Sequence, residues 1–306
     1  MLKNCNSKFV VIPEKPTGID FTDPSNTSYI VSTYELKNAT RRSGSFYIIN
    51  ENFLVCKYIP MTAGIFRFKV SLERGELYAA LANGCLTCMQ LSANNTVDIL
   101  ISNNVILLCV SVCENMALTT DNHGFIHTID LTTGKKESFL GHSLPYTKEP
   151  CEVWNAIWCG NSGAILSGGE DGLLKLWDTR CANRLIDINQ SHTSGVIFLD
   201  TENEFQIISG SYDEHIRRID IRMFHDTHCE QKLGGGVWNI RKIPGSQYII
   251  SCMYGGWAVV NSETFSILNS NSDIGSFLLY DALYNNKLSS IISCTFNNYS
   301  VNCDYL

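Results

Sequence analysis

The chain contains no long apolar run and few basic residues, and both absences exclude protein classes. No apolar stretch approaches the roughly 20 residues that cross a bilayer as a helix, so a membrane span is not expected. The segment Met1–Cys5 lacks the apolar core of a secretory signal. Because the chain has only 23 Lys and Arg against 30 Asp and Glu, and no run of basic residues, nucleic acid is not an expected partner. We expect a soluble, cytoplasmic protein whose acidic balance suits a cationic partner.

Common catalytic and metal-binding motifs are also missing. The sequence has no Gly-x-Ser-x-Gly elbow and no His-Glu-x-x-His motif. The pair Cys85 and Cys88 has no second pair and no nearby His, so no zinc site is expected. The 13 Cys are scattered, often inside apolar runs, which favours reduced, buried thiols. Neither a metal nor a cofactor is expected.

One unit recurs along the chain: an apolar run, small residues, a polar or Gly turn, and a second alternating run. The clearest copies span residues 165–178 and 207–220. Their alternation has the period of a strand rather than a helix. The small residues that end the first run recur every 40 to 48 residues, at Ser32, Ala80, Thr120, Gly168, Gly210, Cys252 and Cys294. Seven copies at this period predict an all-β fold, a seven-bladed β-propeller of the WD40 type.

The seven units are expected to form one domain over residues 1–306. The blades are predicted at about 16–60, 63–99, 105–140, 151–188, 193–231, 235–270 and 277–306. The last unit ends at the C-terminus, so it lacks an outer strand. The run Phe9–Ile12 is expected to supply that strand and close the ring, which removes an open sheet edge.

The turns and strand starts of blades four to six bring several unusual residues to one face, here called the top face. Trp154 and Trp238 align, because they lie two periods apart. WD repeats also contain a structural His, Ser, Asp and Trp network, which is the alternative role for part of this set. Blade four offers Ser167, Asp171 and Trp177 without a matching His. Blade five offers His192, Ser209 and Asp213, with Ile219 in place of the Trp.

Several strings in these blades are more specific than a generic WD repeat. They are Ser167–Arg180, His192–Val196, Gly210–Ile216, Gly234–Trp238 and the pair Cys252 and Met253. In these strings the sequence resembles the diphthine methyl esterase family of WD proteins. The resemblance is strongest over 154–252. Departures occur at 218–220, at Ile243 and Pro244, and over Phe296–Tyr299.

The resemblance implies hydrolysis of the methyl ester of methylated diphthine on elongation factor 2, the protein partner. Diphthine carries a quaternary ammonium group, which aromatic rings and carboxylates stabilise. Candidate binding residues are Trp154, Trp238, Tyr212, Glu170, Glu214, Gly235 and Gly236. Candidate catalytic residues are His215 or His192 as base, oriented by Asp213, with the amides of 235–237 facing the oxyanion. A nucleophile at Ser211 or Cys252 is an open alternative.

A second interpretation is a non-catalytic scaffold or substrate receptor, since a propeller fold alone does not imply catalysis. Clustering of His, Glu and Trp in one sector favours the enzyme over the scaffold. In either case we expect a monomer.

Overall fold

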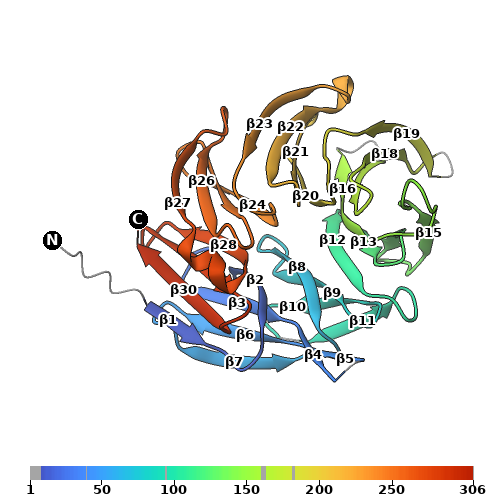
Figure 1. Cartoon of the computed structure of the whole chain (residues 1–306). Helices are drawn as coiled ribbons and strands as arrows, with labels where there is room; N and C mark the ends of the chain where they lie inside the picture. Colours follow the sequence, from blue (N-terminus) through green and yellow to red (C-terminus); the bar gives the residue numbers. More distant parts are fainter. Residues whose placement is uncertain (1–7, 39, 94, 160–162, 181–182, 306) are drawn as a thin grey trace.

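The computed structural model describes residues 8–38, 40–93, 95–159, 163–180 and 183–305. Seven four-stranded antiparallel sheets are arranged around a central channel, which confirms the seven-bladed WD-type propeller (Figure 1). Among the described residues helix is limited to two short 3-10 turns, η1 (Ile221–Met223) and η2 (Asp273–Phe277). No helix in this part of the chain is long and apolar enough to cross a membrane.

The first four blades follow the chain order, with the innermost strand first in each blade. Blade 1 consists of β2 (Pro16–Phe21), β3 (Ser28–Thr33), β6 (Ser45–Asn50) and β7 (Val55–Pro60). Blade 2 consists of β8 (Ile65–Ser71), β9 (Glu76–Leu81), β10 (Cys85–Gln90) and β11 (Thr96–Leu100). Blade 3 consists of β12 (Leu107–Cys113), β13 (Met116–Asp121), β14 (Phe125–Asp130) and β15 (Lys136–Leu140). Blade 4 consists of β16 (Val153–Cys159), β17 (Ala164–Gly169), β18 (Leu174–Asp178) and β19 (Arg184–Asn189).

The remaining blades have the same order, except that the last one combines both ends of the chain. Blade 5 consists of β20 (Val196–Thr201), β21 (Gln206–Ser211), β22 (His215–Asp220) and β23 (Thr227–Lys232). Blade 6 consists of β24 (Asn239–Ile243), β25 (Gln247–Ser251), β26 (Trp257–Asn261) and β27 (Ile267–Asn271). Blade 7 consists of β28 (Leu279–Asn285), β29 (Ser290–Thr295), β30 (Ser300–Tyr305) and β1 (Lys8–Val11).

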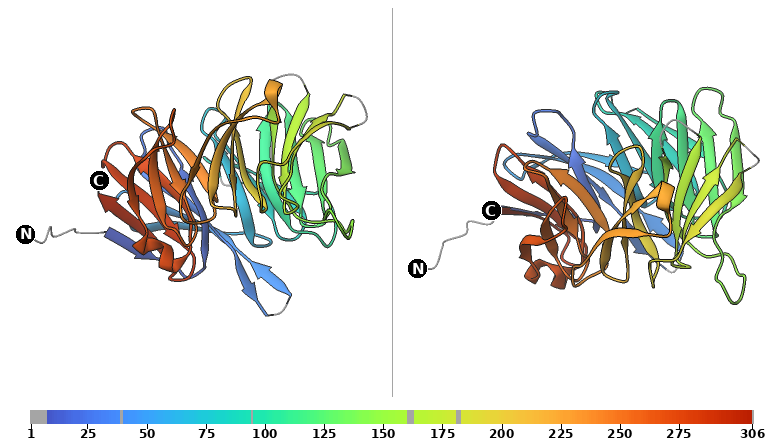
Figure 2. Two further views of the ribbon diagram at one scale, coloured as in Figure 1. Left: turned by 45° about the horizontal axis from the view of Figure 1, so that its top comes forward. Right: turned by 90° about the horizontal axis from the view of Figure 1, so that it is seen from above.

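Strand β1 is the outer strand of blade 7, where it pairs antiparallel with β30. Figure 2 shows this N-terminal strand beside the C-terminal one. The pairing runs from Lys8 with Cys303 to Val11 with Ser300. Because these backbone groups are paired, the last blade does not present β30 as an open edge.

A short hairpin interrupts blade 1 between its second and third strands. It consists of β4 (Glu35–Lys37) and β5 (Arg41–Ser43). In Figure 2 it projects from the body of the propeller. The other blades have tight turns at this place. In blades 2, 3 and 4 the turn contains Gly84, Gly124 and Gly172, each with a positive φ. Blade 5 has Glu214 instead, with φ of 69°.

The apolar core lies between neighbouring blades, because inner-strand residues alternate between the two faces of each sheet. One cluster joins blades 1 and 7 through Ile19, Val31 and Ile292, all fully buried. Another joins blades 5 and 6 through Phe198, Val237 and Ile250. The strand register also corrects one alignment. In blade 6 the residue equivalent to Gly168 and Gly210 is Ser251 rather than Cys252, because Ser251 pairs with Asn239.

Candidate functional site: an aromatic cluster at the top of the channel

The innermost strands begin at the top face, and an equivalent residue stands at the start of each one. In six blades this residue is an inner-strand bulge, skipped by the pairing with the second strand. A bulge re-aims the side chain that the pairing skips. The seven equivalent residues are Thr17, Phe66, Leu108, Trp154, Ile197, Trp238 and Tyr280.

The aromatic members of this ring meet across the channel. The ring centroids of Trp154 and Trp238 are 6.3 Å apart, and Phe66 lies 6.1 Å from Trp154 and 6.0 Å from Trp238. Tyr280 lies 4.7 Å from Trp238. Tyr212, from the turn of blade 5, stands edge-on to Trp154 at 5.8 Å. We call these five residues the aromatic cluster. Residues from blades 2, 4, 5, 6 and 7 therefore converge on one point.

Glu170 provides a carboxylate at the edge of the cluster. The indole Nε1 of Trp154 donates a hydrogen bond of 2.6 Å to its Oε2. The Glu170 side chain is exposed at the top face. Partial burial of its carboxyl raises the pKa above the ordinary value, and the hydrogen bond from Trp154 offsets only part of this rise. Gly195 makes this approach possible, because a Cβ there would lie 2.5 Å from Glu170 Oε2. The pair thus places an indole ring and a carboxylate side by side at the top face.

The structure therefore brings together Trp154, Glu170, Tyr212 and Trp238 from the predicted binding set. Sequence reasoning missed Phe66 and Tyr280, whose rings complete the cluster. It also missed Arg67, whose guanidinium lies 4.8 Å from the Trp238 ring centre. All three could have been found by extending the alignment of strand starts from blades four to six to the whole chain.

The predicted glycine segment next to Trp238 is tightly packed. A Cβ on Gly235 would lie 2.1 Å from the Cys252 carbonyl oxygen, and one on Gly236 would lie 3.2 Å from the Tyr212 ring. The expectation that all amides of 235–237 face an oxyanion is wrong for Val237, because its N–H donates to Ser211 O at 3.0 Å. The Gly235 and Gly236 amides have no acceptor among the described residues.

His192 and Asp213 belong to a buried network within blade 5. His192 contacts Asp213 at 3.0 Å through Nδ1 and Ser209 Oγ at 2.8 Å through Nε2. Arg217 donates to Asp213 at 2.8 Å. Burial lowers the pKa of His192, and the neighbouring Arg217 acts in the same direction. Hydrogen bonds from His192 and Arg217 outweigh the desolvation of Asp213 and hold its pKa well below the ordinary value. This geometry matches the structural role of a WD-repeat network.

The expectation that blade 4 lacks the matching His is wrong, because His142 fills that place. It contacts Asp171 at 2.8 Å and Ser167 at 2.8 Å, and Trp177 Nε1 donates to the same Ser167 oxygen at 2.8 Å. Ten residues separate His142 from β16, whereas three separate His192 from β20. The longer loop hid His142 from the repeat alignment.

His215 lies apart from the aromatic cluster, at the start of the third strand of its blade. Its side chain is 27% exposed, and its Nδ1 lies 2.8 Å from the Asp213 carbonyl oxygen and 3.6 Å from Asp213 Oδ1. In the described part of the chain no ring contact links it to the cluster, and its Nε2 has no hydrogen bond. The neighbouring Glu214 pairs with Lys232 at 3.3 Å instead of reaching the cluster.

Neither alternative nucleophile is presented for attack. Ser211 is fully buried, and its hydroxyl donates to Ser194 O at 3.0 Å. Cys252 is also fully buried, and burial raises the pKa of its thiol to about 12. A thiol of that pKa is protonated at neutral pH, so it lacks the thiolate needed for nucleophilic attack. Among the described residues no group of three His, Cys, Asp or Glu side chains is arranged to hold a metal ion.

Comparison with known proteins adds relatives in sequence and in fold. The chain is 34% identical over 151 residues to a Homo sapiens protein named diphthine methyltransferase, covering 48% of this chain and 33% of the relative. A Mus musculus protein of the same name is 28% identical over 151 residues, or 48% of this chain and 31% of the relative. A Saccharomyces cerevisiae protein of that name is 29% identical over 139 residues, or 36% and 34%. The matches span about a third of each relative's length.

Among solved structures, a chain of the mitotic checkpoint complex matches with a TM-score of 0.76 at 14% identity, covering 98% of this chain and 91% of that chain. The WD40 β-propeller domain of Doa1 matches with a TM-score of 0.73 at 12% identity, covering 97% and 96%. At these identities they support the fold alone. No protein-family model matches the chain.

The seven blades and these relatives agree with the resemblance found in the sequence: the chain is a WD-repeat β-propeller related in sequence to the proteins named diphthine methyltransferase.

Proposed function

We propose that the chain acts in diphthamide biosynthesis and hydrolyses the methyl ester of methylated diphthine on elongation factor 2, in the cytoplasm. The observation that carries the proposal is the aromatic cluster with Glu170 at its edge, in a chain related to diphthine methyltransferases. A quaternary ammonium has no N–H to donate, so rings and a carboxylate are the groups that can hold it. Each ring contact contributes about 0.5–2 kcal/mol when water is excluded.

The reaction adds water to the ester carbonyl and releases methanol, leaving a carboxylate on the modified side chain. It needs a base for the attacking water and donors for the negative oxygen that forms. We assign the base to His215, because its Nε2 is free of hydrogen bonds among the described residues and reachable from solvent. His192 is buried in its network, so we assign it to the stability of blade 5.

The oxyanion donors in this proposal are the free amides of Gly235 and Gly236, which lie next to Trp238 and Tyr212. The cluster would hold the ammonium group, and the adjacent ester would lie beside these amides. Glu214 is left outside the binding set, since its carboxylate is directed to Lys232.

The test uses elongation factor 2 that carries methylated diphthine, incubated with the purified chain. Mass spectrometry of the modified peptide should show loss of one methyl group with release of methanol. A Trp154→Ala variant should lose this activity, while Tyr146→Ala, a change at a 97% exposed residue of another loop, should keep it. An intact ester after incubation with wild-type protein would contradict the enzyme.

One observation favours a second function, a non-catalytic receptor for the modified protein. In the described residues the buried pairs His142–Asp171 and His192–Asp213 are committed to blade structure, so the cluster has no adjacent nucleophile–base pair. In that case wild-type protein would bind the methylated factor through the cluster, and the ester would survive.

A further inference from the structure

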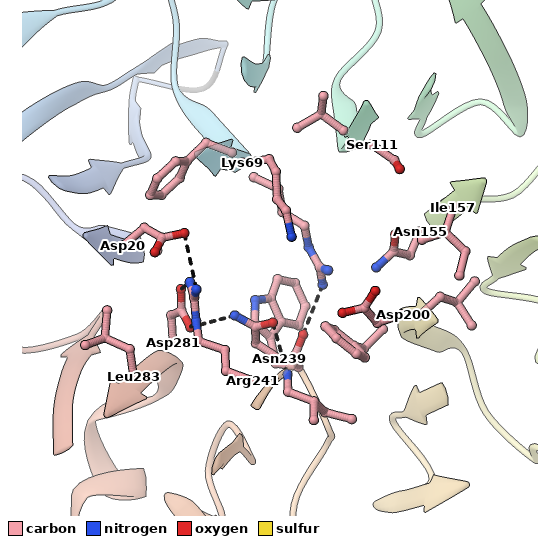
Figure 3. Close-up of a pocket in the computed structure, with 18 of the residues that line it drawn as sticks. Asp20, Lys69, Ser111, Asn155, Ile157, Asp200, Asn239, Arg241, Asp281 and Leu283 are labelled. Atoms are coloured by element: carbon pink, nitrogen blue, oxygen red, sulfur yellow. Dashed lines mark hydrogen bonds and ion pairs between the residues drawn. The ribbon is translucent and has the colours of Figure 1, made fainter. Parts of the chain in front are cut away.

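The charges in the channel beneath the aromatic cluster are balanced. The channel encloses a cavity of about 710 Å³, and the charged side chains that surround it are Arg67, Lys69, Arg241, Asp20, Asp200 and Asp281 (Figure 3). Arg241 pairs with two of these carboxylates, at 2.8 Å and 3.2 Å, as the dashed lines show. Arg67 donates to the carbonyl oxygens of Ile197 at 2.8 Å and Trp238 at 3.3 Å. Lys242 also lines the cavity, but its ammonium turns to a carbonyl oxygen of blade 5 at 3.4 Å. The channel therefore presents no net charge to a partner, unlike the surface above blades 6 and 7.

Three turns form the top surface of blades 6 and 7. They are 253–256 between β25 and β26, η2 before β28, and 296–299 between β29 and β30. Backbone hydrogen bonds join the three turns. The Leu279 amide donates to Met253 O at 3.2 Å, which ties the strand after η2 to the turn of blade 6. The Asn297 amide donates to Phe277 O at 2.9 Å, which ties η2 to the turn of blade 7. We call this connected surface the blade 6–7 ridge.

Two aromatic side chains on the ridge are exposed to solvent. Tyr254 is 65% exposed and Phe277 is 45% exposed. Their turns pack closely, because a Cβ on Gly275 would lie 2.2 Å from the Tyr254 carbonyl oxygen. The ridge also adjoins the aromatic cluster, since Tyr280 follows η2 in the chain. Burial raises the pKa of Tyr280 to about 12, and the nearby phenol of Tyr254 acts in the same direction. Aromatic rings on a fixed backbone are typical of protein contact surfaces, because they add contact area at a small loss of entropy.

The ridge also carries a carboxylate without a cation. Asp273, in η2, is exposed, and in the described part of the chain its carboxylate has no ion pair and no hydrogen bond. The sequence has no Lys or Arg between Lys242 and Lys287, so neither η2 nor the turn of blade 6 supplies a counter-charge. The turn of blade 7 shows how a ring of the ridge meets a cation, because the Lys15 ammonium lies 4.7 Å from the centre of the Phe296 ring. Exposed rings and an unpaired carboxylate therefore favour a partner with Lys or Arg side chains.

We propose that the blade 6–7 ridge docks a basic segment of the protein whose modified side chain enters the aromatic cluster. Lys or Arg side chains of that segment contact Tyr254, Phe277 and Asp273. This inference rests on the proposed function, because it takes the ligand of the cluster to be a side chain of another protein. A side chain is short compared with the width of the propeller, so the polypeptide that carries it lies on the top face and meets the ridge beside Tyr280.

Biolayer interferometry with the immobilised chain and elongation factor 2 carrying methylated diphthine tests the ridge. Tyr254→Ala and Phe277→Ala should each weaken binding by about tenfold, the effect of truncating a ring that carries binding energy in an interface. Asp273→Asn should weaken binding by about threefold at low salt. This difference should vanish at about 1 M salt, where the Debye length is about 3 Å.

Two variants serve as matched controls for these changes. Tyr146→Ala removes a 97% exposed ring from another loop of the top face. Glu263→Gln removes an exposed carboxylate of blade 6 that lies between β26 and β27, at the bottom face. Each control should change affinity less than about twofold, as is usual for exposed side chains outside an interface. Equal losses in the ridge variants and the controls would overturn the proposal, and so would wild-type protein that does not bind the factor.

Two parallel measurements separate this proposal from the esterase. Tetramethylammonium reaches only the cluster, so the ridge variants should bind it as tightly as wild type; a matching loss of its affinity would refute docking on the ridge. Ester hydrolysis is followed by mass spectrometry in the same samples. If wild type binds the factor and leaves the ester intact, the esterase is wrong, while tenfold weaker binding by Tyr254→Ala and Phe277→Ala still supports the ridge. If the ester is hydrolysed and both variants bind the factor like wild type, the ridge is wrong and the esterase stands.

Discussion

The indole nitrogen of Trp154 donates to Glu170 at 2.6 Å, so the polar edge of the ring is occupied, while Phe66 stacks beside the ring at 6.1 Å. A cation above the ring would meet the π face and the carboxylate together. Tetramethylammonium, titrated by tryptophan fluorescence, is a direct probe. Trp154→Leu should weaken its binding by about 0.5–2 kcal/mol, the range for one cation–π contact. Glu137→Gln, at an exposed residue of an outer strand, serves as control and should have no effect. Unchanged affinity in Trp154→Leu would remove the cluster as a cation site.

The same pair predicts a pH dependence of cation binding. Burial raises the pKa of the Glu170 carboxyl above its ordinary 4.5, so it takes up a proton at a higher pH than an exposed Glu. The protonated carboxyl no longer attracts a cation, and affinity should therefore fall as pH is lowered, beginning above 4.5. The Glu170→Gln variant should bind more weakly at neutral pH, by about 1 kcal/mol for a charge near the surface. Its affinity should no longer vary in this pH range, and a variant with the wild-type pH profile would refute the role of Glu170.

The burial of His142 predicts that pH also affects the stability of the fold, independently of cation binding. Burial lowers its pKa, because the charged form is desolvated, and Lys175 acts in the same direction. Below the ordinary value of 6.5 the unfolded chain takes up a proton that the folded chain refuses, so the free energy of unfolding should fall as pH drops below 6.5. Asp171 acts in another window, since its lowered pKa supports the fold above 3.8 and that support is lost only in stronger acid.

Urea denaturation at pH 7.5 and 5.5 measures this effect. His142→Asn should lose about 1–3 kcal/mol at pH 7.5, because buried partners lose their hydrogen bonds. In this variant the free energy of unfolding should also change less between the two pH values than it does in wild type. His225→Asn is the control, as the His225 side chain is 71% exposed. If the free energy of unfolding changes equally with pH in wild type and in His142→Asn, then His142 titrates alike in the folded and unfolded chain.

The sequence allowed the blades to be predicted, because their signal is local. Each apolar run and each turn repeats at a near-constant period, and the seven-bladed prediction needs no long-range information. His142 was missed because its loop to β16 has seven more residues than the equivalent loop before β20. The spacing that identifies His192 therefore fails for His142.

The aromatic cluster could be predicted only in part, because it depends on bulges and on the closing of the ring. A bulge inserts one residue, which breaks strict alternation and turns Phe66 and Tyr280 toward the channel. The contact between Phe66 and Trp238 joins blades 2 and 6, and no local pattern records such a pair. Arg67 was missed for the same reason, since its acceptors are in blades 5 and 6.

Glu214 provides a test of backbone strain at the top face. Its φ of 69° lies in the left-handed region, which costs an L-residue roughly 1–2 kcal/mol. Blade 4 has Gly172 at the equivalent position, with φ of 74°. The pair with Lys232 is exposed and contributes little. Glu214→Gly should therefore raise the free energy of unfolding, by up to about 1 kcal/mol after the larger entropy of unfolded Gly is subtracted. A thermal melt measures this, and a lower melting temperature would show that the Glu214 side chain supports the turn.

His215 and His192 should respond differently to substitution. Blade 4 has Leu173 where blade 5 has His215, so the same turn accepts Leu without a change of register. His215→Leu should leave stability within about 0.5 kcal/mol of wild type, as for other partly exposed positions. If His215 is the base, its loss should slow hydrolysis of the methyl ester by about 100-fold or more.

His192→Asn should show the reverse, because His192 connects Asp213 to Ser209 in the buried network. We expect a stability loss of about 1–3 kcal/mol and near-normal turnover by the molecules that remain folded. Both variants are assayed on elongation factor 2 carrying methylated diphthine, with rates corrected for the folded fraction from the melting curve. If His215→Leu works at the wild-type rate, His215 is not the base. If both variants fold and both hydrolyse the ester normally, the turn of blade 5 is not part of the catalytic centre, and the base must be sought among the other residues around the aromatic cluster.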